Sequence, residues 1–211
     1  MIERYAPPKL REVWSDRRRF DLWRQIEVLA CEAWSELGRV PAEALPRIRA
    51  ATLDVDRVAD VEAHVGHDVI AFLTVLGESV GQPEARYLHL GLTSSDVVDT
   101  AFAMQLRESG EIVAADLSGL RRVAAELAVR HRRTLMAGRT HGIHAEPITF
   151  GFKVAGWVAE LDRAVARLEA ATAEVATGKL SGPVGTHASV DPRVEEHVCR
   201  ALGLRVDPVS T

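Results

Sequence analysis

Two histidines three residues apart, His141 and His144, stand in the segment GRTHGIHAEP at residues 138–147. A histidine side chain titrates near neutral pH and can deliver a proton to a leaving amine. The same spacing also fits a loop between helices whose histidines make local hydrogen bonds, and a zinc pair. The zinc interpretation lacks a third ligand nearby and a His-Glu-x-x-His pattern. Spacing alone therefore favours the structural loop.

Hydroxyl side chains gather in LTSSDVVDT, residues 92–100, directly before a long helical pattern. Thr93 and Ser94, together with free backbone N–H groups at a helix N-terminus, suit a carboxylate or a phosphate. A plain N-cap with Asp96 in the first turn would give the same sequence. The two interpretations are compatible, because a capping residue can also face a ligand.

Two further pairs are candidates for binding a phosphate. His67 and Asp68 open a helical pattern, where an aspartate suits the positive end of the helix dipole. A capping aspartate beside a surface histidine is the simpler interpretation. Arg4 precedes Tyr5, and arginine offers the fork of donors that phosphate accepts. A disordered terminus is the obvious alternative for this second pair, which by itself indicates almost nothing.

The glycine-rich segment SGPVGTHASV at residues 181–190 is open to two interpretations, a flexible connection or an anion-binding loop. It lacks the pattern of a phosphate-binding loop, so we interpret it as a connection.

The composition is that of an ordinary globular protein, with 47% hydrophobic residues, 27% charged residues and a formal charge of −4. Acidic and basic residues alternate without a long basic block, which argues against nucleic-acid binding. No apolar run is long enough for a bilayer, and the first residues lack the apolar core of a secretory signal. We therefore predict a cytoplasmic protein without a membrane partner, in which Cys31 and Cys199 are free thiols.

The periodicity of apolar residues predicts an almost entirely helical chain. The first long helix is expected to begin after Ser15 as N-cap and to stop at Gly38. The later expected segments are short helices around Pro41 and Pro46, helices near 54–64 and 67–80, a long helix from Ser94 to about Arg133, a second from Pro147 at its first position to about Thr177, and a short helix at 192–202.

Two very long helices joined by one short loop predict an elongated antiparallel bundle, which needs partners along its whole length. We expect a domain boundary near residues 91–93. The predicted domains are an N-terminal domain of short helices at 1–92 and the first part of a long central bundle at 93–211.

Taken together, the motifs resemble those of one enzyme family. Arg4-Tyr5, HDVIAF at 67–72, LGLTSSDVVDT at 90–100 and GRTHGIHAEPITFG at 138–151 stand in the order and spacing of adenylosuccinate lyases, members of the fumarase/aspartase superfamily. The resemblance covers essentially all 211 residues. It implies an all-α fold and a homotetramer whose active sites are assembled from several subunits.

The resemblance also implies a reaction and the roles of particular residues. Such enzymes eliminate fumarate from adenylosuccinate, giving AMP, and from a succinyl-carboxamide ribotide, with no metal or organic cofactor. His141 would be the general acid that protonates the leaving nitrogen. Thr93 and Ser94 would bind the succinyl carboxylates, and His89 would lie near the site. The nucleotide end and its phosphate would be held by Arg4, Tyr5, His67, Asp68 and the backbone of Val69.

One departure qualifies this expectation. The resembled enzymes are about twice as long, and their flexible loop with the serine thought to act as general base has no match in these residues. We therefore expect the chain alone to be inactive or nearly so. Two other classes stay open, a non-catalytic helical oligomerisation module and a related lyase or cycloisomerase acting on another carboxylate.

Overall fold

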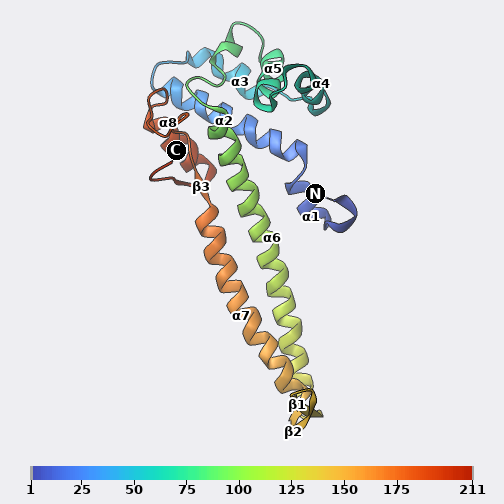
Figure 1. Cartoon of the computed structure of the whole chain (residues 1–211). Helices are drawn as coiled ribbons and strands as arrows, with labels where there is room; N and C mark the ends of the chain where they lie inside the picture. The colour runs from blue at the N-terminus through green and yellow to red at the C-terminus, as the bar shows by residue number, and fades with distance from the viewer. Residues whose placement is uncertain (1, 211) are drawn as a thin grey trace. The chain divides into compact units, whose positions relative to one another are not determined.

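The computed structural model describes residues 2–210 and is predominantly helical (Figure 1). The helices and strands, in chain order, are η1 (Glu3–Tyr5), α1 (Pro8–Val13), α2 (Asp16–Glu36), η2 (Ala42–Ala44), α3 (Leu45–Ala50), α4 (Val55–Val65), α5 (Asp68–Val80), η3 (Glu84–Tyr87), α6 (Ser94–Arg130), β1 (Leu135–Thr140), β2 (Ile143–Thr149), α7 (Phe150–Val175), β3 (Thr177–Gly178), α8 (Pro192–Leu202) and β4 (Arg205–Val206). The all-helical prediction is thus confirmed, apart from two small pairs of strands.

Local signals account for most helix ends. Ser15 caps α2, since its hydroxyl accepts a hydrogen bond from the backbone N–H of Arg18 at 3.1 Å. Gly38, with φ of 72°, takes the left-handed conformation just beyond the end of α2. The helix α8 begins and ends at the predicted residues, after the cap Asp191 and before Gly203.

The chain forms two compact units, one of which is built from both ends of the sequence. It contains the residues up to Glu108 and those from Val175 onward. Its core includes Phe20, Trp23 and Phe72, whose ring centroids lie 5.2–6.0 Å apart. The helix α8 packs on α2 and adds buried residues from the C-terminal segment.

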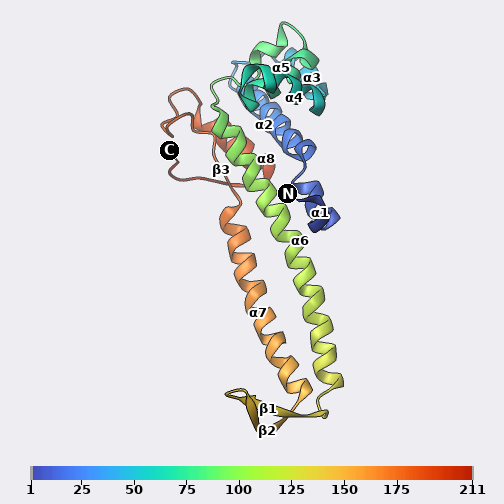
Figure 2. The same ribbon diagram turned by 45° about the vertical axis from the view of Figure 1, so that its right-hand side comes forward.

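The second unit, Ser109–Glu174, consists of most of α6 and α7 and the hairpin that joins them. Figure 2 shows these parts of α6 and α7 running side by side in opposite directions. A Cβ atom on Gly110 would lie 2.2 Å from Oγ1 of Thr172, so the two helices approach closely there. Among the described residues of this unit, Ala124 and Val154 are the buried ones larger than glycine.

The structure corrects the predicted connection between the long helices. Residues 135–149 form an antiparallel hairpin instead of a loop, and Pro147 lies in β2 opposite Ala137. Pro147 is therefore not the first residue of a helix. The start of α7 is set by Thr149, whose hydroxyl accepts from the N–H of Phe152 at 3.1 Å, as an N-cap does.

The domain boundary predicted near residue 92 falls just before α6, which begins at Ser94. The compact units divide the chain at other places, inside α6 and at the end of α7, so the two-domain division stays a prediction. Within residues 2–210, no helix combines the length and the apolar character that crossing a membrane requires.

Candidate active site

The first turn of α6 is held by the side chain of Asp96. Thr93 precedes the helix, and its backbone N–H donates to Oδ2 of Asp96 at 2.9 Å. This is the backbone half of a capping box, with aspartate three residues after the cap. The hydroxyls of Thr93 and Ser94 are half-buried, and no hydrogen bond of either is found among the described residues. Both remain available to a ligand at a helix N-terminus.

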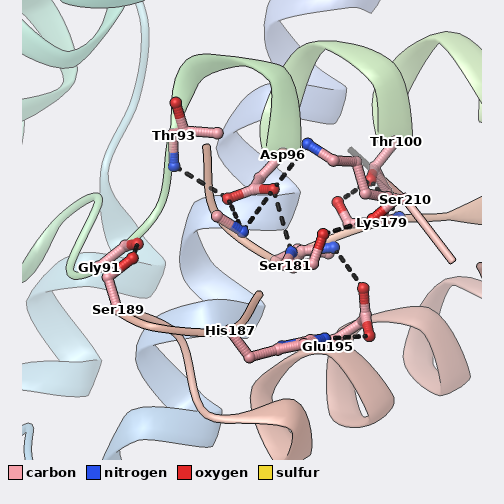
Figure 3. A network of polar contacts seen from close by, with 12 residues as sticks. Gly91, Thr93, Asp96, Thr100, Lys179, Ser181, His187, Ser189, Glu195 and Ser210 are labelled. Atoms are coloured by element: carbon pink, nitrogen blue, oxygen red, sulfur yellow. Dashed lines mark hydrogen bonds and ion pairs between the residues drawn. The ribbon is translucent and has the colours of Figure 1, made fainter. Parts of the chain in front are cut away.

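Asp96 also ties the start of α6 to the segment that follows β3 (Figure 3). Its buried carboxylate accepts the backbone N–H groups of Ser181 and Gly182 at 3.1 and 3.2 Å and the ammonium group of Lys179 at 3.2 Å. The Asp96 carboxylate therefore has both an opposite charge and hydrogen-bond donors, which a buried carboxylate requires. The residues 181–190, interpreted above as a connection, are thereby fixed at the start of α6.

The loop before Thr93 is fixed at its carbonyl groups. The indole N–H of Trp34 donates to the carbonyl of Leu90 at 2.8 Å, and the hydroxyl of Ser189 donates to that of Gly91 at 2.7 Å. Gly91 has φ of 76°, and a Cβ atom there would lie 2.1 Å from the carbonyl oxygen of Ser189. Only glycine fits this crossing without a shift of the backbone.

His89, in the same loop, is held by a carboxylate from α2. Glu27 is fully buried and accepts the backbone N–H of His89 at 2.7 Å, while its other oxygen lies 2.6 Å from the ring Nδ1 of His89. His89 adopts a left-handed backbone, with φ of 59°, which is uncommon for a residue other than glycine.

A third buried carboxylate lies under the 181–190 segment. Glu195 on α8 accepts the N–H of Leu180 at 2.8 Å and lies 3.6 Å from Nε2 of His187. Burial raises the pKa of the Glu195 carboxyl above its ordinary value, and the hydrogen bond from Leu180 opposes part of that rise. Figure 3 shows His187 and Glu195 side by side beneath Ser181.

The N-terminus of α5 carries the predicted His67, Asp68 and Val69. His67 is the N-cap, and its Nδ1 lies 3.5 Å from the N–H of Ile70. Asp68 accepts the N–H of Val69 at 2.7 Å and lies 3.4 Å from the ring of His67. Both polar side chains are about half exposed, so this helix start can meet a ligand from solvent.

Arg4 and Tyr5 lie in the short helix η1 and are exposed. The guanidinium of Arg4 lies 4.7 Å from the ring centroid of Tyr5. Such a contact at an exposed place contributes roughly 0.5–1 kcal/mol, so it fixes the pair only weakly.

His141 occupies the tight turn between β1 and β2. Thr140 pairs with Ile143, which leaves His141 and Gly142 as a two-residue turn with φ of 51° and 74°. Positive φ at both positions is characteristic of the type I′ turn that joins hairpin strands. His141 is exposed at the tip, and His144 lies in β2.

The described contacts do not bring the predicted residues together. Arg4 with Tyr5, His67 with Asp68 and Val69, Thr93 with Ser94, and His141 form separate groups, and no contact found among residues 2–210 joins one group to another. His141 belongs to the unit 109–174, and the other groups belong to the first unit.

Sequence reasoning missed the buried partners Glu27, Lys179 and Glu195. Glu27 left a signal, because it shares the face of α2 that buries Trp23 and Ala30. A charge on an apolar helix face needs a partner. Lys179 and Glu195 left no comparable local signal.

The comparisons with known proteins agree with this architecture. The chain is 46% identical to the adenylosuccinate lyase of Bacillus subtilis and 50% identical to that of Synechocystis, in each case over 100% of this chain and 49% of the relative. It spans about half the length of the curated relatives it matches. The resemblance to the N-terminal half of adenylosuccinate lyases is therefore confirmed.

Solved structures and a family model give the same result. A fumarate lyase from Mesorhizobium matches with a TM-score of 0.91 and 33% identity, covering 98% of this chain and 50% of the other. A 3-carboxy-cis,cis-muconate lactonizing enzyme from Pseudomonas putida matches with a TM-score of 0.89 and 32% identity, covering 97% of this chain and 49% of the other. The fold is thus the helical fumarase/aspartase type. The Lyase family model matches residues 3–211, and the chain belongs to that family.

Proposed function

We propose that this chain supplies the N-terminal half of a lyase that eliminates fumarate from adenylosuccinate and from the succinyl-carboxamide ribotide. The observation that carries the proposal is the anchored start of α6. Thr93 and Ser94 present hydroxyls at a helix N-terminus, which suit a carboxylate, and Asp96 holds this helix start in place through Lys179 and Ser181. The 43–50% identity to adenylosuccinate lyases favours a succinyl group as the ligand.

In the proposed reaction, this chain supplies the general acid and the C-terminal half supplies the general base. A base removes the proton from the carbon next to a carboxylate, and the C–N bond breaks with its electron pair on nitrogen. His141 donates a proton to that nitrogen, because an amine is a poor leaving group unless it is protonated. Donors at Thr93 and Ser94 stabilise the negative charge that develops on the carboxylate side.

The nucleotide end is assigned to Arg4, Tyr5, His67, Asp68 and the backbone of Val69. The N–H of Val69 is engaged by Asp68 in the structure. A phosphate that used this N–H would therefore displace the carboxylate of Asp68, and His67 and Arg4 would supply the compensating positive charge.

A cytoplasmic location and assembly into a homotetramer are parts of the same proposal. The assembly is supported by the second unit, where side chains such as Leu120, Val123 and Phe152 are exposed by 55%, 52% and 72%. Apolar surface of this kind on two long helices marks an association surface. Association would also let His141 of one copy complete a site with residues of others.

Fumarate release from adenylosuccinate tests the proposal. We would measure it for the 211-residue chain alone and for a chimaera in which these residues are followed by the C-terminal half of the Bacillus subtilis enzyme. The chimaera is expected to be active, and the chain alone inactive. In the chimaera, His141→Ala should lower the rate about 10²–10⁴-fold, the usual worth of a general acid.

His144→Ala is the matched control, because His144 is the neighbouring exposed histidine of the same hairpin. It should leave the rate nearly unchanged. Normal activity of the His141→Ala chimaera would overturn the acid assignment, and a folded but inactive unmutated chimaera would overturn the proposed reaction.

A second candidate is a cycloisomerase-type reaction on an unphosphorylated carboxylate, favoured by the TM-score of 0.89 to the muconate lactonizing enzyme. The two candidates differ at Arg4 and His67, which only a phosphorylated substrate needs. Competition by AMP supports the purine substrate, whereas failure of AMP to compete favours the second candidate.

A further inference from the structure

The pair formed by Glu27 and His89 has no role in the reaction described so far. We propose that Glu27 is a positioning residue: it fixes the tautomer and orientation of the His89 ring and the backbone of the loop that delivers Thr93 and Ser94 to the substrate. This inference rests on the proposed function, and it adds to the site a residue from α2 that the motifs do not contain.

Geometry is the first argument. Glu27 has a relative exposure of 0%, and each of its two oxygens contacts a different nitrogen of His89, the backbone N–H at 2.7 Å and the ring Nδ1 at 2.6 Å. Two contacts to one residue fix the ring relative to its own backbone. They also offset the strain of the left-handed conformation at φ 59°, which is unfavourable for a residue with a Cβ atom.

The acceptor chemistry of a carboxylate determines the tautomer. An ionised carboxylate has no hydrogen to donate, so the ring Nδ1 must carry the hydrogen in the 2.6 Å contact. Nε2 is then the ring nitrogen left for a ligand. Among the described residues, no protein partner of Nε2 is found, and the His89 side chain is 19% exposed. Nε2 accepts a hydrogen bond when the ring is neutral and donates one when the ring is protonated.

The cost of burying the Glu27 side chain argues that this residue positions His89 and does not merely fill space in the core. Glu27 lies on the face of α2 that buries Trp23 and Ala30, where an apolar side chain would avoid the desolvation of a charge. The loop already has tethers at its carbonyl groups, from Trp34 to Leu90 and from Ser189 to Gly91. What Glu27 adds to these tethers is control of the His89 ring.

The loop links this pair to the substrate end of the site. The carbonyl of His89 accepts the N–H of Leu92 at 3.2 Å, and Thr93 follows as the cap of α6. His89 therefore lies one turn before the two hydroxyls assigned to the succinyl carboxylates. A ring released from Glu27 would change both the donor pattern and the conformation of this turn.

The first experiment needs no substrate, and it uses a variant only to assign a signal. In the 211-residue chain labelled with ¹⁵N-histidine, the ring shifts of His89 report which nitrogen carries hydrogen, and the spectrum of His89→Asn assigns the signal among the eight histidines. We expect hydrogen on Nδ1. Hydrogen on Nε2 alone would overturn the proposal, whatever the outcome of the lyase assay.

The second experiment compares two variants in the active chimaera. Glu27→Gln keeps an oxygen for the backbone N–H of His89, but its amide donates to Nδ1 and moves the ring hydrogen to Nε2. We expect kcat/KM to fall about 10–100-fold, as for other residues that orient a functional histidine. Trp34→Phe is the matched control, since it removes a tether of the same loop without touching the ring. It should leave the His89 tautomer unchanged.

A double substitution separates positioning from loss of folding. In a His89→Asn background, Glu27→Gln should change kcat/KM by less than about twofold, because its effect passes through His89. The change in kcat/KM produced by Trp34→Phe should be the same with and without His89, because Trp34 does not act through the His89 ring. Equal losses from Glu27→Gln with and without His89, or a changed tautomer with unchanged kcat/KM, would overturn the proposal.

Discussion

The two compact units differ in where their stability resides. The first buries an aromatic cluster and three carboxylates, Glu27, Asp96 and Glu195, with partners drawn from both ends of the chain. The second, residues 109–174, has little buried surface of its own and exposes large apolar side chains along both helices. The first unit is therefore organised by its own core, whereas the second exposes apolar surface that the proposed assembly would cover.

The same contrast holds for polar interactions. The pair of Asp96 and Lys179 is almost completely buried, with side chains exposed by 0% and 10%. The ion pair of Arg121 and Asp162 across the second unit is about half exposed on both sides. Buried pairs are costly to break, whereas exposed pairs contribute little. Substitutions at matched places in the two units test this difference.

The largest effect is expected at Asp96. Asp96→Ala leaves Lys179 buried without its partner and removes the acceptor of three backbone N–H groups. Breaking a buried pair in this way costs about 3–5 kcal/mol. Denaturant unfolding of the 211-residue chain would measure the loss.

Asp162→Ala is the control for Asp96→Ala, because it removes a carboxylate of the same type from the exposed pair. Its unfolding midpoint should stay close to that of the unsubstituted chain. Equal destabilisation by both changes would contradict the contrast between the units.

The next effect concerns association. Leu120→Glu places a charge on the exposed apolar surface of the second unit, and we expect self-association to weaken about tenfold or more, equivalent to ~1.4 kcal/mol. Sedimentation velocity over a range of concentrations would measure it. Val65→Glu is the control, since Val65 is exposed to a similar degree (47%) in the first unit; association should be insensitive to that change.

A loss of stability smaller than that of Asp96→Ala is expected from substitutions of glycines in the first unit. Gly91→Ala would place a Cβ atom 2.1 Å from the Ser189 carbonyl and force the backbone beside Thr93 to move. The expected loss of stability is about 2–4 kcal/mol, within the range for strained sites. Gly66→Ala has a similar φ with open space around it, so it should cost only about 1–2 kcal/mol. Thermal unfolding would rank the two, and an equal loss would show that the contact with Ser189 is unimportant.

The smallest effect is a dependence on pH. The raised pKa of Glu195 means that the folded protein holds this proton more tightly than the unfolded chain does. The resulting stability is present below the ordinary pKa of 4.5 and is lost as pH rises through the raised value. Glu195→Gln removes this dependence, so its melting temperature relative to the unsubstituted chain should increase with pH across that interval. A constant difference across that range would contradict the assignment.

Much of the helical fold could be predicted from sequence because its signals are local. Ser15, Gly38 and the limits of α8 were recognisable from capping residues and periodicity. The hairpin was missed because Pro147 fits the start of a helix as well as a strand. The turn Thr140–Ile143 held the better signal, since His141 and Gly142 are two residues able to take positive φ between paired strands.

The candidate site was predictable only as separate segments. The motifs located Thr93, Ser94 and His67 at helix starts, where they lie. Their supports were not predictable, because Lys179 lies 83 residues from Asp96 and His89 lies 62 residues from Glu27 in the sequence. Contacts of this separation follow from tertiary packing and leave no periodic pattern.

The discontinuity of the first unit has a consequence for synthesis on the ribosome. Asp96 is translated 83 residues before Lys179, and α2 long before the helix α8 that packs on it. Until those residues emerge, the nascent chain carries an unpaired carboxylate and an uncovered apolar face on α2. Contacts between residues so far apart in the sequence form slowly, and the exposed apolar surface can aggregate before they form. The segment that runs from Lys179 through α8 is therefore the one that allows the first unit to finish folding.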